Sequence, residues 1–437
     1  MPEKPAINIF WFRRDLRLEN NAGLYHALKS GLPVLPVFIF DKEILDKLAD
    51  KDDARVTFIH RALFELNENL KNYGSSLLTK YNSPLIAWKE ILEEFNVTEV
   101  FCNNDYEPYA RKRDAEIAEL LQSHRAKFNS YKDHVIFEKN EILKDDGKPY
   151  TVFSPYKRKW LEKLAVEFHF KAYPNSKYSG AFFKLPHSGI ISLNEMGFKE
   201  NSLVLPGKVY QSILANYADL RDYPAIAGTS QIGIHLRFGT LSIRELALEA
   251  SSESQVWLSE LIWRDFYSMI LWHFPYSANQ SFKKEFDAIK WRNNEQEFEA
   301  WCEGKTGYPI VDAGIRQLKA TGWMHNRVRM IVASFLCKHL LIDWRWGEAY
   351  FARKLLDYDQ ASNVGGWQWA AGTGNDAAPY FRVFSPDLQT KKFDPEGKYI
   401  RRWIPEFDNP FEYPQPIVEH KFARERALNA YKAALTK

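Results

Sequence analysis

AINIFWFRRDLRLENN (residues 6–21) opens with an apolar run typical of a buried strand and continues into a charged loop. Four more apolar runs follow it, at 34–41 (VLPVFIFD), 75–80, 99–103 and 127–131. Amphipathic stretches separate them at about 53–73, 83–95 and 107–124. Strands that alternate with helices at this spacing form a parallel sheet with helices on both faces. We therefore predict a Rossmann-like α/β domain over residues 1–133.

The loop after the first strand argues against a dinucleotide site in this domain. It reads Arg13-Arg14-Asp15-Leu16-Arg17 where a dinucleotide fold has a GxGxxG turn. Without glycines, the backbone cannot approach a pyrophosphate closely. An NAD site here is therefore not expected.

After residue 133 the sequence pattern is first irregular and then helical. Residues 134–206 contain scattered glycines and prolines that interrupt any regular period, which predicts an interdomain connector. Residues 207–437 show helical periods and no clear strand. The predicted fold class is thus α/β + all-α, with an α/β domain followed by an all-helical domain.

Composition excludes several classes of protein. The net charge of +3 over 437 residues means that any nucleic-acid surface must be a local patch. The three cysteines are far apart and the eleven histidines show no ligand spacing, so no metal site is expected. No apolar run is long enough to span a membrane and the N-terminus lacks a signal peptide, so a cytoplasmic location is expected.

Tryptophan is concentrated in the second half of the chain. Eleven of the fourteen tryptophans lie after residue 250. Tryptophan is often a core residue, but a bias this strong also suggests stacking or redox work in the helical domain.

The segment 257–273 carries polar and aromatic residues on one helical face. Glu260, Trp263, Arg264 and Tyr267 are spaced by three and four residues. The face could bind a ligand, or it could be an ion pair between Glu260 and Arg264 beside a packed tryptophan. Spacing alone favours neither interpretation.

Two further segments contain candidate ligand-binding residues. In 323–339, Asn326 and Met330 share a face, although a capped helix with a core methionine explains them as well. In 357–384, Asp357, Asp359 and Asn363 precede paired glycines and two tryptophans. Glycines beside an amide and aromatic rings suit the close approach of a flat ligand, so the functional interpretation is favoured there.

Two weaker signals concern phosphate. Residues 228–233 (GTSQIG) offer hydroxyls and backbone amides ahead of a helix, although Ser and Thr are also common helix caps. Residues 382–403 carry six basic and three acidic side chains interleaved with aromatic ones. That pattern fits a surface for a nucleic-acid backbone, or simply a solvated face.

Taken together, these segments resemble the photolyase/cryptochrome family, and within it the class I cyclobutane pyrimidine dimer photolyases. The resemblance covers nearly the whole chain, in FWFRRDLRLENN (10–21), WLSELIWRDFY (257–267), KTGYPIVDAGIRQLKATGWMHNRVRM (305–330), the long segment from 343 to 386 and YPQPIVEHKFAR (413–424). It implies light-driven DNA repair, in which reduced FAD donates an electron to a flipped-out pyrimidine dimer. The partner implied is UV-damaged DNA, bound by a monomer.

The resemblance also assigns site residues. The dimer pocket is matched by Glu260, Trp263, Asn326, Met330 and Trp367. In that pocket Glu260 would hydrogen-bond the dimer carbonyl, and Trp263 and Trp367 would pack on the flipped bases. The FAD positions are matched by Tyr217, Thr229, Ser230, Gln231, Ile232, Gly233, Trp257, Arg264, Trp323, Asn326, Arg329, Asp357, Asp359 and Asn363.

Within the FAD positions, Asn363 would face the flavin N5, and Arg329 and Asp357 would form an ion pair near the ring. The chain departs from its relatives at Gly233 and Ile234, where they usually have Ser and Pro. One phosphate contact is therefore expected to come from the backbone only. Trp367, Trp344 and Trp291 match the tryptophan chain that reduces the flavin in light.

Contacts with DNA are implied for Arg221, Glu260, Tyr267, Asn326, Arg327, Arg382 and Gln389. The antenna site departs from folate-binding relatives, which have a Cys–Lys pair where this chain reads Ser277-Ala278-Asn279. A deazaflavin-type pattern is closer, in Arg55, Asp105, Glu107 and Arg237. A deazaflavin-like antenna, or none, is therefore expected rather than folate.

Three rival functions are weighed against repair. A cryptochrome-like photoreceptor would keep the fold and the flavin, but plant cryptochromes have Asp at the position of Asn363, and many carry a C-terminal tail that does not follow the last predicted helix here. A six-four photolyase would have a histidine pair where this chain has His325-Asn326. A non-catalytic DNA-binding module would not need the cluster at 357–369.

Overall fold

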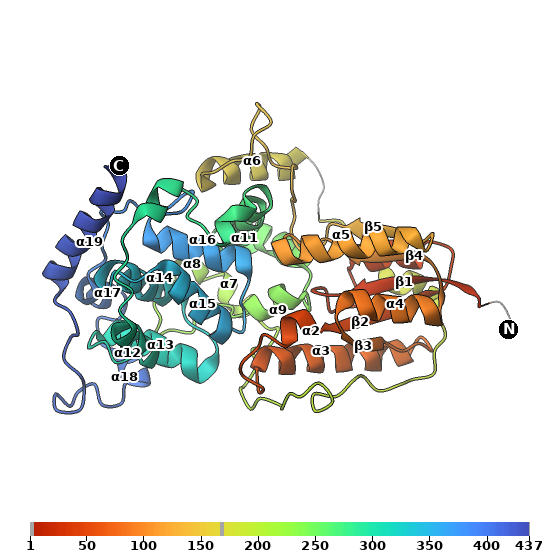
Figure 1. The fold of residues 1–437 in the computed structure, drawn as a ribbon, viewed down its shortest axis with the longest axis horizontal. Helices are drawn as coiled ribbons and strands as arrows, with labels where there is room; N and C mark the ends of the chain where they lie inside the picture. Colours follow the sequence, from red (N-terminus) through yellow and green to blue (C-terminus); the bar gives the residue numbers. More distant parts are fainter. Residues whose placement is uncertain (1–3, 167–169, 437) are drawn as a thin grey trace. The chain divides into compact units, whose positions relative to one another are not determined.

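The computed structural model describes residues 4–166 and 170–436 (Figure 1). They form two compact units. The first runs to Glu138 and also contains 163–208 and 234–249, and the second contains 139–162, 209–233 and the chain from Ala250 onward. The predicted connector is thus divided between the units, and 234–249, predicted to be part of the helical domain, belongs with the sheet. Of the predicted domains and connector, residues 1–3, 167–169 and 437 lie outside the described residues.

Five parallel strands in the order β3-β2-β1-β4-β5 form the sheet of the first unit. They are β1 (Ala6–Phe12), β2 (Val34–Asp41), β3 (Leu78–Asn82), β4 (Asn96–Asn103) and β5 (Lys127–Tyr131). The strand predicted at 75–80 begins three residues later, because Asn67 accepts hydrogen bonds from Leu77 N and from the Ser76 hydroxyl. These groups therefore serve the preceding helix and not the sheet.

Alternate side chains of β1 enter two separate cores, which confirms helices on both faces. Phe10 and Phe12 pack with residues of α1 (Ala22–Leu28) and α3 (Ala54–Lys71). Ile9 and Trp11 pack with residues of α4 (Pro84–Glu94) and α5 (Pro108–Ser123). The two-residue period of a strand sends neighbouring side chains to opposite faces, so a strand with apolar side chains on both faces must be covered on both.

Most of the remaining elements are helices. Those before residue 255 are α2 (Lys42–Leu45), α6 (Phe153–Val166), η1 (Asn175–Ala181), α7 (Gln211–Leu214), α8 (Tyr217–Leu220), α9 (Gly233–Phe238) and α10 (Ile243–Glu253). Those that follow are α11 (Gln255–His273), η2 (Pro275–Ala278), η3 (Lys284–Ala288), α12 (Glu295–Glu303), α13 (Pro309–Thr321), α14 (Asn326–Ser334), η4 (Phe335–His339), α15 (Trp344–Lys354), α16 (Gln360–Ala371), α17 (Pro386–Phe393), α18 (Lys398–Trp403) and α19 (His420–Leu435). Among the described residues no strand follows β5, as expected for a helical second unit.

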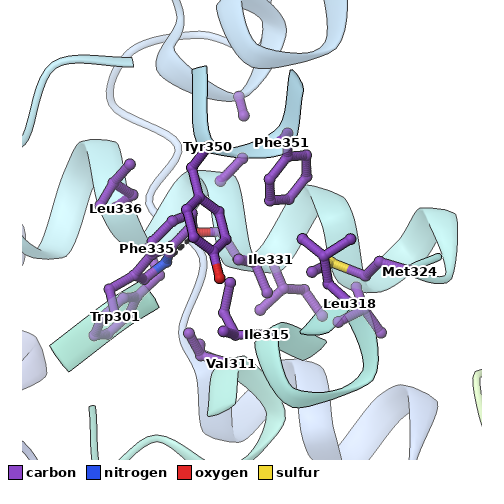
Figure 2. Close-up of a cluster of buried hydrophobic side chains, with 14 of the residues drawn as sticks. Trp301, Val311, Ile315, Leu318, Met324, Ile331, Phe335, Leu336, Tyr350 and Phe351 are labelled. Atoms are coloured by element: carbon purple, nitrogen blue, oxygen red, sulfur yellow. Dashed lines mark hydrogen bonds between the residues drawn. The ribbon is translucent and has the colours of Figure 1, made fainter. Parts of the chain in front are cut away.

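The core of the helical unit is rich in aromatic side chains (Figure 2). Trp301 of α12 is fully buried in this core and donates its indole N–H to Val332 O at 3.3 Å. Trp367 of α16 packs into the same core against Trp301 and Phe351, with ring centroids 6.1 and 5.0 Å apart. Part of the tryptophan excess is therefore structural.

Gly347 allows Trp367 to reach this position. A Cβ atom at residue 347 would lie 2.1 Å from Trp367 Cη2. Gly347→Ala is therefore expected to destabilise the protein by about 2–3 kcal/mol, because overpacking outweighs the better helix propensity of alanine. Urea unfolding followed by circular dichroism measures this change.

Gly366 provides the matched control, because a Cβ there meets no atom within 4 Å. Gly366→Ala is expected to be neutral or to stabilise the helix by up to about 1 kcal/mol. Equal effects of the two substitutions would contradict the close packing of Trp367 on α15.

Within residues 4–166 and 170–436, every helix is too short or too polar to cross a bilayer. The same residues contain no group of three or more His, Cys, Asp or Glu side chains arranged to hold a metal ion.

Candidate functional site

The face of α11 predicted from residue spacing exists, and its tryptophan is braced from behind. α11 begins after Ser254, which accepts a hydrogen bond from Trp257 N. Trp263 stacks on Phe153 with ring centroids 3.6 Å apart and planes inclined by 7°. Tyr267 lies one turn further on, 5.3 Å from Trp263. Phe153 thus fixes one side of a half-buried indole, as a stacking platform requires.

Glu260 forms an ion pair, but not with the partner considered from the sequence. Its carboxylate accepts from Arg221 Nη1 at 2.5 Å, and Arg221 lies directly after α8. Burial is the largest influence on the pKa of Arg221 and lowers it, but Glu260, Tyr217 and Asp222 together outweigh burial, and the pKa is raised. The sequence interpretation of a Glu260–Arg264 pair is therefore replaced by a Glu260–Arg221 pair.

α14 presents the second predicted group. His325 precedes the helix, and its Nδ1 accepts from Arg327 N at 3.1 Å. Burial lowers the pKa of His325 to about 4, so the ring is neutral and can accept this bond. Asn326 is exposed and Met330 half-buried, and Arg327 Nη1 lies 3.8 Å from Met330 Sδ. Asn326 and Met330 are thus available to a ligand.

The predicted ion pair between Arg329 and Asp357 is present. Arg329 Nη2 donates to both oxygens of Asp357, at 2.9 and 3.1 Å, and Arg329 Nε donates to Met324 O. Asp357 also lies against Gly233, where a Cβ would be only 2.7 Å from Asp357 Cβ. This contact explains the departure at residue 233, because a serine would collide with Asp357.

The segment before Gly233 has a backbone suited to binding an anion. Gln231 has φ of +52°, a left-handed conformation that is uncommon outside glycine. A residue in this conformation is one half of the backbone arrangement that turns successive N–H groups into a concave donor site. Thr229 and Ser230 are half-buried just before it, and Ile232 is buried. That a phosphate contacts only the backbone here stays a prediction.

Asn363 of α16 is held in one orientation. Its Nδ2 donates to Glu348 O at 3.2 Å and to Glu348 Oε1 at 2.9 Å. Because both bonds use the amino group, the Asn363 carbonyl oxygen remains the free polar atom. Burial raises the pKa of Glu348, and the bonds from Asn363 and Tyr358 partly offset this. Glu348 therefore sets which end of the amide a ligand meets.

The predicted role of Trp367 in the dimer pocket is wrong. Its side chain is 2% exposed, inside the core between Gly347, Trp301 and Phe351, so no base can stack on it. Trp369 is half-buried and lies 6.5 Å from Phe384. It falls on the least buried stripe of α16, which is formed by Ser362, Gly365, Gly366 and Trp369. Trp369 is the indole of this helix that can contact a bound base.

The second role of Trp367, as an electron donor, is compatible with its burial. Trp344 is buried in the same core, and Trp291 packs against the edge of that core. Trp291 is half-buried, with its ring edge-on to Tyr431 at 5.9 Å. The three indoles therefore lie in or beside one apolar core, and Trp291 is the one that is partly exposed to solvent. The electron path itself stays a prediction.

Tyr267 connects α11 to α16. A Cβ at Gly365 would lie 2.3 Å from the Tyr267 ring, so only glycine permits this contact. Asp359 begins α16 by accepting from Ser362 N at 3.1 Å. The paired glycines thus serve different purposes: Gly365 receives a tyrosine ring, while Gly366 faces open space. An open helical face beside an oriented amide fits a flat ligand such as an isoalloxazine ring.

Two predicted cofactor residues have a mainly structural environment. Trp257 is buried and stacks flat on Tyr210, with centroids 5.4 Å apart. Tyr217 is buried beneath the guanidinium of Arg221. Trp323 is half-buried at the start of the α14 segment. Direct contact of these rings, and of Arg264, with a cofactor stays a prediction.

Basic and aromatic side chains gather around α17. Arg327 lies 4.4 Å and Lys392 5.2 Å from the ring centre of Phe393. Arg382 is exposed beside Phe384, and Gln389 is half-buried on α17. Some of the basic side chains in 382–403 are already paired with acidic ones, Lys398 with Glu396 and Arg401 with Asp408. Binding of a nucleic-acid backbone at this surface stays a prediction.

Three of the four predicted antenna residues, Asp105, Glu107 and Arg237, belong to one cluster of ion pairs in the α/β unit, together with Arg14. Arg14 donates to Asp105 and to Glu107, at 3.0 Å each, and Arg237 pairs with Glu107. Arg55 pairs with Asp53, the residue that begins α3. Asp105 follows β4 and Arg14 follows β1, which are adjacent strands. These charges therefore meet at the carboxyl end of the sheet, where α/β folds bind ligands, although as mutual ion pairs.

Sequence reasoning missed three residues of the site: Phe153, Glu348 and Trp369. Trp369 could have been found from its position on the least buried face of α16. Phe153 and Glu348 act through contacts with other helices, for which a single sequence carries no signal.

Comparisons with known proteins match both parts of the chain. Residues 8–175 match the family model described as DNA photolyase, and 257–433 match the FAD binding domain of DNA photolyase. The deoxyribodipyrimidine photo-lyase of Escherichia coli (strain K12) is 39% identical over 472 residues, which cover 98% of both chains.

Solved structures agree. A bacterial class III photolyase from Agrobacterium tumefaciens has a TM-score of 0.87 and 33% identity, over 100% of this chain and 99% of that one. An archaeal photolyase from Sulfolobus tokodaii, solved with two FAD molecules, has a TM-score of 0.83 and 32% identity, over 98% of this chain and 100% of that one. With similarity of this extent in sequence and in structure, the chain belongs to the DNA photolyase family, and its helical unit contains the family's FAD-binding domain.

Proposed function

We propose that this protein uses light and reduced FAD to split cyclobutane pyrimidine dimers in UV-damaged DNA. The observation that carries the proposal is the braced, half-buried Trp263 beside the Glu260 carboxylate on α11, which packs against the α16 helix that presents Asn363. A base taken out of a duplex needs an aromatic face and hydrogen-bonding partners. This cluster offers both next to the FAD-binding elements.

The side chains have distinct tasks in this proposal. Trp263 stacks on one extruded base, with Phe153 holding it flat, and Trp369 provides the second aromatic surface. Glu260, as a carboxylate, accepts from the ring N–H of a pyrimidine; a bond to the dimer carbonyl would require it to carry a proton. Asn326 and Met330 line the α14 side.

Three groups of residues would hold the cofactor. Arg329 and Asp357 would flank it, the backbone around Gln231 would receive phosphate, and Asn363 would present its carbonyl oxygen, because Glu348 accepts from its amino group. A reduced flavin bound there would supply light-driven one-electron chemistry, which lends an electron to the dimer until the two cyclobutane C–C bonds are broken. The protein keeps donor and acceptor close and excludes water.

Arg221, Arg327, Arg382 and Gln389 are proposed to contact the DNA backbone. The Sulfolobus tokodaii relative, whose second FAD is described as implying a light-harvesting cofactor, makes an antenna reasonable here. A deazaflavin-type antenna at Arg55, Asp105, Glu107 and Arg237 stays a proposal, as do a monomeric, metal-free state and a cytoplasmic location.

Repair of a defined dimer tests the function directly. Purified protein with reduced flavin is mixed with an oligonucleotide containing one thymine dimer and illuminated at near-ultraviolet wavelengths, and restored thymine is measured by chromatography. We expect light-dependent repair and no repair in the dark. A flavin-loaded sample that repairs nothing would favour the cryptochrome-like photoreceptor.

Glu260→Ala is expected to lower the repair yield per absorbed photon severalfold while the flavin stays bound. The substitution removes the acceptor for the pyrimidine and deprives Arg221 of its closest ionic partner. Glu253→Ala, at an exposed glutamate of α10, is the control. An unchanged yield in Glu260→Ala would show that the catalytic carboxyl group lies elsewhere.

A further inference from the structure

Four alternating charges connect the proposed dimer pocket to the proposed DNA surface. Glu260 pairs with Arg221 at 2.5 Å, Arg221 Nε lies 4.0 Å from Asp222 Oδ1, and the same oxygen accepts from Arg327 Nη2 at 2.7 Å. We call Glu260, Arg221, Asp222 and Arg327 the ion chain. It joins the pocket carboxylate to two arginines that would each bind a phosphate.

The ion chain is only partly covered. The arginine side chains are 20% and 21% exposed, and the carboxylates of Glu260 and Asp222 are 33% and 38% exposed. The guanidinium groups are fixed by aromatic rings, Arg221 by Tyr217 and Arg327 by Phe393. An incoming phosphate can therefore replace a carboxylate without moving the arginine far.

Asp222 is the one acidic member of the ion chain that is not assigned to the pocket. It stands where a DNA phosphate would bind, since it already receives Arg327 and lies beside Arg221. A carboxylate placed in this way competes with phosphate for the same donors. The presence of Asp222 therefore weakens DNA binding, so any advantage of this carboxylate must lie in a step of the repair cycle other than binding.

We propose that Asp222 recaptures the two arginines after repair and so speeds the release of repaired DNA. The inference rests on the proposed function, because it needs a dimer that holds the ion chain open. While the dimer is bound, its contacts with Trp263 and Glu260 add to the phosphate contacts and outweigh the cost of separating the ion pairs. Once the dimer is split, its bases return to the duplex and only the phosphate contacts oppose closure of the ion chain.

This cycle has a specific consequence for the affinity of the protein for damaged and undamaged DNA. Asp222 costs every DNA complex the same separation of charges, so its removal tightens the binding of damaged and undamaged DNA alike. It does not create discrimination between them. What it changes is the lifetime of the product complex, where no dimer contact offsets that cost.

Asp222→Asn tests the proposal, with Asp219→Asn as its matched control. Asparagine preserves shape and can still accept from Arg327, but it lacks the charge. Asp219 is exposed, three residues earlier in the chain, and in the part of the chain that the structure describes its carboxylate has no bonding partner. Both substitutions change the net charge equally, so a difference between them reports the position of the charge.

For Asp222→Asn we expect undamaged duplex to bind about fivefold more tightly, mostly through slower dissociation, as for the loss of one half-exposed ion pair. The slope of log affinity against log salt should steepen by about one, because no carboxylate takes the arginines back. Flavin content and the yield of a single-turnover flash should match the wild type. Under continuous light with excess dimer substrate, turnover should fall. Asp219→Asn should change each of these less than twofold.

Weaker DNA binding by Asp222→Asn would overturn the proposal and show that Asp222 only positions the arginines. Equal effects of the two substitutions would also overturn it, since net charge alone would then suffice. Tighter binding with unchanged turnover would refute the role in release. Absence of repair in the wild type would instead refute the proposed function, while the contrast between the two variants on undamaged duplex would still test the ion chain.

Discussion

Trp367→Phe is expected to slow the light-driven reduction of the bound flavin by more than an order of magnitude, without impairing repair by enzyme reduced chemically beforehand. Trp367 is enclosed in the core, where water cannot act as the donor, and shares this core with Trp344. Phenylalanine keeps the aromatic packing but is much harder to oxidise than an indole. Absorption spectra of the oxidised protein under blue light with an external reductant measure the effect.

The control for this substitution is Trp301→Phe. Trp301 lies in the same core and touches Trp367, but it is not part of the predicted chain of Trp367, Trp344 and Trp291. Both variants replace a buried indole of the same core by a phenyl ring, and Trp301→Phe also loses the hydrogen bond to Val332 O. Slow flavin reduction confined to Trp367→Phe would therefore report the position of the donor and not a general loss of packing. Flavin reduction at the wild-type rate in Trp367→Phe would exclude Trp367 as the first donor, whatever its packing role.

Asp357→Ala is expected to purify with little FAD. Both carboxylate oxygens of Asp357 accept hydrogen bonds from Arg329, and Asp357 lies against Gly233, next to the proposed phosphate segment. Removing Asp357 leaves the charge of Arg329 uncompensated in a largely buried place. Because solvent still reaches part of this pair, we expect FAD binding to weaken by about 2 kcal/mol, or roughly thirtyfold in affinity. The ratio of absorbance near 450 nm to that at 280 nm, with calorimetric titration of FAD, measures it.

Asp408→Ala is the matched control for Asp357→Ala. Asp408 also receives two hydrogen bonds from an arginine, Arg401, but that pair is exposed to solvent. Its loss should cost little, as for surface ion pairs in general, and flavin content should not change. Full flavin occupancy in Asp357→Ala would place the cofactor away from this ion pair.

Sequence patterns predicted the α/β unit well where each element carries its own signal. The runs at 6–12, 34–41 and 127–131 became β1, β2 and β5 with the same bounds. Errors occurred where a contact from elsewhere decided the boundary. At β3 the Asn67 side chain takes the hydrogen bonds of Ser76 and Leu77, and at 234–249 the chain joins the sheet unit although its pattern is helical.

The candidate site shows the same division. The shared face of Glu260 and Trp263 follows from helical spacing, and the ion pair of Arg329 and Asp357 followed from family resemblance. The buried environment of Trp367 did not, because it depends on a glycine in a different helix, Gly347.

Residue order alone thus determined the alternation of strands and helices, the helical character of the second half and which residue types share a face, because these depend on periods of two and of 3.6 residues along one segment. Tertiary structure alone decided the partners of several charged and aromatic groups at the site. Arg221 rather than Arg264 pairs with Glu260, Phe153 supports Trp263, and Glu348 orients Asn363. Each of these contacts joins segments distant in the chain, and its geometry exists only once the helices have packed.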